Sequence, residues 1–204
     1  NNYSIRKIVK FCCIINIVCR LLHLEAHRMD LTHEIGSNPL DLSIIQDILR
    51  QDKKLVLSLD AESRIKKCRT YLDTKITTAS KPIYGINTGF GALYNVKIKD
   101  ENLQKLQENL VMSHACGTGD KVPDEIVKLM LLLKIQSLSY GHSGVQLATV
   151  NRLINFYNHD VIPVVYEQGS LGASGDLSPF AHLTVPFVGL GEVTYNGNRL
   201  SVTE

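Results

Sequence analysis

The chain has 204 residues, which is long enough to bury a hydrophobic core in one domain or two. Its composition, 44% hydrophobic and 21% charged, is ordinary for a soluble globular protein, and a net charge of +2 indicates neither a nucleic-acid nor a membrane partner. The five cysteines are odd in number and include no Cys-x-x-Cys pair, so they do not suggest a disulfide framework. We therefore expect a reducing compartment and a cytoplasmic location.

The first 28 residues differ from the rest of the sequence. Basic residues at positions 6, 7 and 10 precede an apolar run over 11–19, which is the charge pattern of a signal peptide. No small-x-small cleavage site follows, and the run is too short to span a membrane. We interpret residues 1–28 as an atypical extension and expect the fold to occupy residues 29–204.

Helical spacing of apolar residues dominates the sequence from residue 41 to residue 157. It predicts helices after Asp41, over 61–73 with Asp60 as a candidate cap, over about 101–115, and over 147–157. Residues 124–139 are apolar on nearly every side, which is typical of a helix buried in a bundle or an oligomer. Glycine, proline and asparagine interrupt the pattern between 74 and 100 and predict an ordered loop.

Two short segments indicate β structure. The run Val161–Val165 is extended, but its proline keeps it from a central strand. Asn196-Gly197 lies between Glu192–Tyr195 and Asn198–Val202 and predicts a type I′ hairpin. The sequence as a whole therefore predicts a mainly α protein with small β pieces.

Residues 169–179 read Gly-Ser-Leu-Gly-Ala-Ser-Gly-Asp-Leu-Ser-Pro and suggest a backbone that reacts with itself. The Gly175 amide nitrogen, uncrowded by any Cβ, could attack the Ala173 carbonyl, and Ser174 could lose its β-hydroxyl as water. The product would be a five-membered methylidene-imidazolone, an electrophile that ordinary side chains do not supply. An unmodified loop before a helix is the alternative, with Asp176 or Ser178 as the cap and Pro179 in the first turn.

This run resembles the cofactor signature of the aromatic amino acid ammonia-lyases. Three further segments match that family in order: Tyr-Gly-Ile-Asn-Thr-Gly-Phe-Gly at 84–91, Leu-Gln-Glu-Asn-Leu-Val-Met-Ser-His-Ala-Cys-Gly at 106–117, and Leu-Lys-Ile-Gln-Ser-Leu-Ser at 133–139. The resemblance covers the chain from about residue 30 onward, with histidine ammonia-lyases as the closest match. It implies a globular N-terminal domain leading into a long helical bundle, and a homotetramer whose active sites combine three subunits. Family chains are more than twice as long, so we expect an N-terminal portion truncated at its C-terminus.

The resemblance also implies roles for individual residues. Ala173, Ser174 and Gly175 would form the methylidene-imidazolone cofactor without any external cofactor or metal, with Asp176 as a helper or as a helix cap. Tyr84 would be the base that removes a β-proton. A free phenol has a pKa of about 10, so this role requires a site that lowers it. A tyrosine packed in a loop is the structural alternative for this residue.

The pair Ser113-His114 matches the position at which family members read the substrate side chain, and it favours histidine. A satisfied core histidine is the alternative for His114. The predicted reaction converts the small-molecule substrate L-histidine to urocanate and ammonia. The alternatives are a tyrosine or phenylalanine ammonia-lyase, an aminomutase, or a catalytically incomplete fragment. We interpret the remaining notable side chains as packing residues: Phe90, Cys116, His142 and His182.

Overall fold

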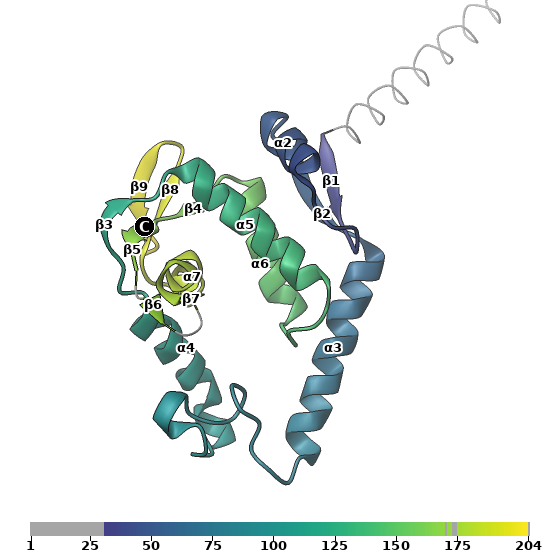
Figure 1. The fold of residues 1–204 in the computed structure, drawn as a ribbon, viewed down its shortest axis with the longest axis vertical. Helices are drawn as coiled ribbons and strands as arrows, with labels where there is room; N and C mark the ends of the chain where they lie inside the picture. Colours follow the sequence, from purple (N-terminus) through teal and green to yellow (C-terminus); the bar gives the residue numbers. More distant parts are fainter. Residues whose placement is uncertain (1–30, 170, 173–174, 204) are drawn as a thin grey trace, which may run out of the picture. The chain divides into compact units, whose positions relative to one another are not determined.

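The computed structural model of this chain describes residues 31–169, 171–172 and 175–203. The described part is mainly helical with short strands, which confirms the predicted fold class (Figure 1). It forms two compact units, one with the described residues of 31–34 and 39–56, the other with those of 35–38 and 57–203. The boundary predicted after residue 28 lies outside the described residues and stays a prediction.

The first unit holds α2 (Leu42–Arg50) and all but the last residue of β1 (Thr32–Ile35) and of β2 (Lys54–Leu57), in the order β-α-β. Helix α2 begins where predicted, because the Asp41 carboxylate accepts a hydrogen bond from the backbone N–H three residues on, at 2.8 Å. The Lys54 N–H donates to the Leu31 carbonyl and the Ser58 N–H to the Ile35 carbonyl. Both bonds advance in the same direction, so the two strands are parallel.

Helix α3 (Leu59–Thr78) is longer than the predicted 61–73, and its cap is Ser58 rather than Asp60. The Ser58 hydroxyl accepts from the Ala61 N–H at 3.1 Å. Asp60 lies inside the first turn and pairs with Arg64 one turn later. The helix continues past residue 73 because the first proline after it is Pro82, and an established helix propagates at little cost per residue.

Helices α5 (Asp124–Ser139) and α6 (Leu147–Asn158) have the predicted bounds to within one residue and pack against each other and against α3 (Figure 1). Their shared core contains the following fully buried side chains: Ile65, Val127, Leu131, Leu132, Ile135, Val150, Leu153 and Tyr157. Burial of α5 on every side is not found within this chain. Its neighbours α3 and α6 cover one face, and Ile126 and Leu133 on another are 46% and 45% exposed.

The predicted loop holds two short 3₁₀ helices, η1 (Gly91–Leu93) and η2 (Asp100–Asn102). Helix α4 (Leu103–His114) follows, within two residues of its predicted bounds. Helix α7 (Leu177–Thr184) packs against α4 and continues into the 3₁₀ helix η3 (Val185–Val188). The pair α4 and α7 carries most of the residues considered below.

Three small antiparallel sheets join these helices. Strand β3 (Thr118–Lys121) pairs with β5 (Tyr166–Gln168), and β6 (Leu171–Gly172) pairs with β7 (Gly175–Asp176). In the third sheet β4 (Ile162–Pro163) is an edge strand on β8 (Glu192–Tyr195), which also pairs with β9 (Asn198–Ser201). The turn residues Asn196 and Gly197 have φ of 49° and 74°, which confirms the type I′ hairpin.

Candidate active site

Tyr84 stands in a loop that is braced from within by its neighbours Asn87 and Thr88, both nearly fully buried. The side-chain oxygen of Asn87 accepts a hydrogen bond from the Ile83 N–H at 2.7 Å. The backbone carbonyl of Asn87 accepts another from the Ile98 N–H at 2.9 Å. Gly85 adopts φ +76°, a left-handed conformation that glycine takes without strain. The loop is therefore ordered, as predicted, and presents Tyr84, which is 62% exposed.

His114 is the last residue of α4, and its ring is oriented by the helix backbone. Its Nδ1 lies 2.8 Å from the Leu110 carbonyl oxygen. A carbonyl oxygen only accepts, so Nδ1 carries the hydrogen and donates it. In the neutral ring Nε2 is then the nitrogen with a free lone pair. The Ser113 hydroxyl also donates to the Leu110 carbonyl, at 3.0 Å, and lies 3.1 Å from His114 Nδ1.

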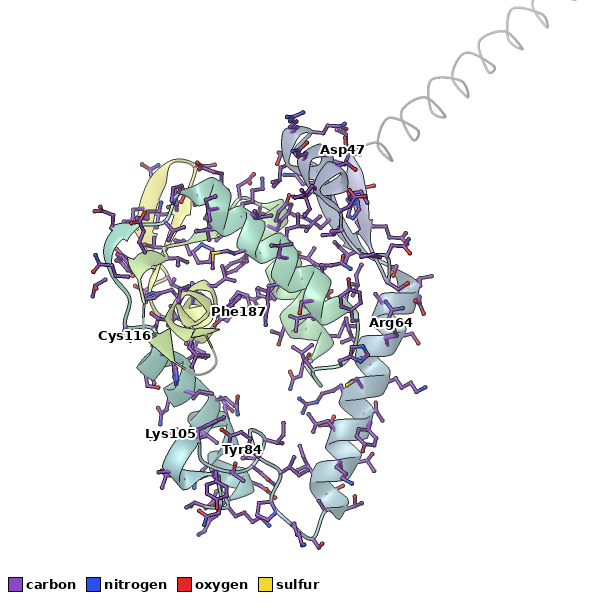
Figure 2. The ribbon with its side chains drawn as sticks, in the orientation of Figure 1. Asp47, Arg64, Tyr84, Lys105, Cys116 and Phe187 are labelled. Atoms are coloured by element: carbon purple, nitrogen blue, oxygen red, sulfur yellow. The ribbon has the colours of Figure 1, made fainter. Side chains whose placement is uncertain are left out.

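One pocket of about 700 Å³ brings Tyr84 and His114 together with α7. Figure 2 labels Tyr84 in the loop beside α4, and Cys116 just beyond the end of that helix. Most of the lining is apolar: Phe90, Leu110, Val111, Leu177, Phe180 and Ala181. The polar lining side chains are Tyr84, His114, Lys134 and Thr184. An apolar pocket with a few convergent polar groups is the usual form of a small-molecule site.

The predicted reactive tripeptide lies just before α7, the helix that forms one side of this pocket. Ala173 and Ser174 lie outside the described residues, as does the side chain of Asp176. Gly175 is described and has φ +85°, and its strand β7 pairs with β6 on the other side of the tripeptide. Leu177, two residues after Gly175, lines the pocket. The pairing of β6 with β7 thus fixes where the chain enters and leaves the tripeptide.

The structure corrects two interpretations of single residues. Ser178 does not cap α7, because it is the second residue of that helix and its hydroxyl is fully buried. Phe90 is more than a packing residue, since it lines the pocket and meets the Tyr84 ring edge to face at 6.0 Å between centroids. Ser113 is not among the lining residues, although it contacts His114.

Sequence reasoning missed Lys134, which lines the pocket from α5. Its ammonium lies 5.3 Å from the centroid of the Phe180 ring, within the range of a cation–π contact. The matched segment over 133–139 contained this lysine, but helical spacing alone does not tell which exposed face of a helix borders a pocket. The tertiary placement of α7 against α4 was needed to see it.

Across residues 31–169, 171–172 and 175–203 no three His, Cys, Asp or Glu side chains gather in a way that could hold a metal ion. Over the same ranges no helix combines the length and the apolar character needed to cross a membrane.

Comparison with known sequences places residues 40–204 in the family model of the aromatic amino acid lyases. A histidine ammonia-lyase of Legionella pneumophila (strain Corby) is 47% identical over 165 residues, which are 81% of this chain and 32% of that protein. The histidine ammonia-lyase of Symbiobacterium thermophilum is 43% identical over 84% of this chain and 33% of its own length. This chain thus spans about a third of the length of these relatives.

Solved structures give the same assignment. The ergothionase of Treponema denticola superposes with a TM-score of 0.79 at 27% identity, covering 84% of this chain and 34% of its own. The phenylalanine aminomutase of Pantoea agglomerans reaches a TM-score of 0.78 at 28% identity, covering 84% and 33%. Family model, sequence identity and fold agree, and the chain belongs to the aromatic amino acid lyase family.

Proposed function

We propose that the protein to which this chain belongs is a histidine ammonia-lyase, which eliminates ammonia from L-histidine to give urocanate. The observation that carries this proposal is the pocket that joins Tyr84, His114 and the start of α7. The identity of 43–47% to histidine ammonia-lyases supports the choice of histidine. Because the chain spans about a third of those relatives, the proposal concerns the activity of the whole protein.

The orientation of His114 favours a substrate side chain that donates a hydrogen bond. Nδ1 is engaged by the Leu110 carbonyl, so Nε2 of the neutral ring is an acceptor. The imidazole N–H of histidine and the hydroxyl of tyrosine can each donate to it, whereas a phenyl ring cannot. A phenyl ring would leave Nε2 of this half-buried histidine without a partner, and this disfavours phenylalanine.

Tyr84 is the candidate base for the β-proton of the substrate. This residue lines the pocket from a braced loop, contacts the Phe90 ring and is 62% exposed, so a ligand in the pocket can reach it. The lining beside it is mostly apolar, and Tyr84 itself is exposed at the mouth of the pocket.

The described backbone fits a self-made cofactor in the tripeptide. Gly175 has φ +85°, and among the described residues beyond its chain neighbours no heavy atom lies within 4 Å of the position where a Cβ would stand. A methylidene-imidazolone formed there would supply an electrophile for the amino group of the substrate. Asp176 follows directly and stays the candidate helper. Assembly as a homotetramer in the cytoplasm is part of the proposal, supported by the exposed Ile126 and Leu133 of α5 and by the cysteine pattern.

The test is an ultraviolet assay for urocanate after addition of L-histidine to the full-length protein. We expect activity in the wild type and none above background in Ser174→Ala, whose mass should also lack the loss of two waters over residues 173–175. Wild-type activity in Ser174→Ala would overturn the mechanism. Faster turnover of tyrosine or phenylalanine would overturn the substrate.

An aminomutase is the second candidate, because the phenylalanine aminomutase of Pantoea agglomerans has nearly the same fold over this segment. Product analysis separates the two functions. An α,β-unsaturated acid with free ammonia indicates a lyase, and a β-amino acid indicates a mutase.

A further inference from the structure

His182 on α7 makes a hydrogen bond to a distant part of the chain. The Gly117 backbone N–H donates to His182 Nε2 at 2.9 Å, across 65 residues of sequence. Gly117 follows the end of α4 by three residues, and His182 follows Gly175 by seven. This single contact therefore ties the end of the helix that carries His114 to the helix that continues from the tripeptide.

The contact is close on every side. A Cβ placed on Gly117 would lie 3.1 Å from His182 Nε2 and 3.1 Å from the Ser178 hydroxyl oxygen, so any other residue would have to push these neighbours back by a few tenths of an ångström. Ser178 is fully buried, and within the described residues its hydroxyl has no hydrogen-bond partner. The Tyr166 ring of β5 meets His182 edge to face at 5.2 Å. Three separate segments thus enclose the imidazole.

The geometry requires the neutral form of the ring. Nε2 accepts a hydrogen bond, so it carries no proton, and protonation would set an N–H against the Gly117 N–H. Burial lowers the pKa of His182 below its ordinary value of 6.5, and this also favours the neutral ring. Charged and titratable residues surround this contact on several elements. Helix α4 carries Lys105, Glu108 and His114, and strands β3 and β5 carry Asp120, Lys121, Tyr166 and Glu167. Lys134 of α5 lies over the Phe180 ring of α7, and Arg199 donates to the Tyr166 hydroxyl.

We propose that His182 is a positioning residue for the reaction. Its neutral imidazole fixes the end of α4, and with it His114, against the start of α7, so that the two ends of an amino acid substrate are held at a set spacing. Small losses of such positioning reduce reaction rates strongly. This inference rests on the proposed function, because it assumes that His114 and the tripeptide act on one substrate.

Three variants of the full-length protein test the proposal. His182→Gln keeps an acceptor oxygen near the place of Nε2 and removes the titration. His182→Leu removes the acceptor. His159→Gln is the matched control, because His159 is exposed and its Nδ1 bonds within its own helix. We expect kcat/KM to fall at least about tenfold in His182→Leu and to change less than about threefold in the other two.

The pH profile distinguishes positioning from a purely structural role. In the wild type kcat/KM should fall as the pH drops through the lowered pKa of His182, below 6.5, and in His182→Gln this part of the fall should vanish. Titration of the substrate is common to both proteins and cancels in the comparison. The inference would be overturned if the wild type and His182→Gln lost activity equally as the pH falls. It would also be overturned if His182→Gln and His182→Leu lost the same activity at neutral pH.

A measurement without substrate keeps the two proposals separable. The quantity to measure is the protection factor of the Gly117 amide in hydrogen exchange. It should be high in the wild type and in His182→Gln, and at least about tenfold lower in His182→Leu. The assay uses whichever amino acid the wild type converts best, so a wrong choice of histidine leaves this test intact. If His182→Leu does not fold, loss of Gly117 protection in the acidified wild type still decides, and retained protection there would refute the contact.

Discussion

Replacement of Gly117 by alanine tests how tightly α4 is joined to α7. The added methyl would meet His182 Nε2 and the Ser178 hydroxyl oxygen at 3.1 Å, and His182 Cδ2 at 3.2 Å. Unstrained carbon contacts lie at about 3.5–4.0 Å, so each neighbour would have to retreat by a few tenths of an ångström. Ser178 is fully buried and His182 is held by the Gly117 amide, so neither can retreat freely.

The expected loss follows from two opposing effects. Overpacking of a fitted site costs about 1–3 kcal/mol. Alanine also restricts the unfolded chain, which returns about 0.4–1 kcal/mol where the backbone suits it. Gly117 does not have a positive φ, so no left-handed strain is added. We expect Gly117→Ala to lower the free energy of unfolding by about 1.5 kcal/mol and the melting temperature by about 3–6 °C.

Thermal unfolding followed by circular dichroism measures this change. Gly36→Ala is the matched control, since it also lacks a positive φ and its new methyl would meet only Ser58, at an ordinary 3.5 Å. The control should melt at the wild-type temperature or slightly above it. If Gly117→Ala melts with the control, the close approach between the end of α4 and α7 is not present in solution.

Three further predictions concern other parts of the chain. Tyr84→Phe should lower kcat about 10²–10⁴-fold while leaving circular dichroism unchanged; an unchanged kcat would exclude Tyr84 as the base. On α5, Leu131→Ala should cost about 2–5 kcal/mol in urea unfolding because this side chain is fully buried, whereas the half-exposed Leu133→Ala should cost under about 1 kcal/mol. Burial, and after it the charge of Lys53, lowers the pKa of His33 below 6.5 in the folded protein. As the pH falls below 6.5, the unfolded chain therefore binds a proton at this residue before the folded chain does. The contribution of His33 to stability is thus complete above pH 6.5 and declines as the pH falls. His33→Gln should flatten the dependence of the urea midpoint on pH in this range, and an unchanged slope would contradict it.

Helix positions were predictable from the sequence wherever one short-range rule decided them. Asp41 caps α2 as its side-chain chemistry indicates, and the type I′ turn at Asn196-Gly197 follows from two residues that tolerate positive φ. The start of α3 was predicted wrongly because Ser58 and Asp60 are both competent caps and only the fold decides between them.

The residues that belong to sequence motifs of the site were predictable, whereas the residues that join the site through long-range contacts were not. Tyr84 and His114 were selected from their motifs, and the structure brings both into one pocket. Lys134 and His182 could not be singled out in the same way, because their partners lie 46 and 65 residues away in sequence and helical spacing reports only on neighbours within a helix. Long-range contacts of this kind become visible only once α7 is placed.

The proline of β4 closes one edge of the third sheet. Val164 donates to the Glu192 carbonyl, so Pro163, one residue earlier, occupies the position whose nitrogen faces away from β8. A strand added at this outer edge would need an N–H from that nitrogen, and proline has none. The sheet therefore cannot template a further strand there, which protects the chain against edge-to-edge aggregation while it folds.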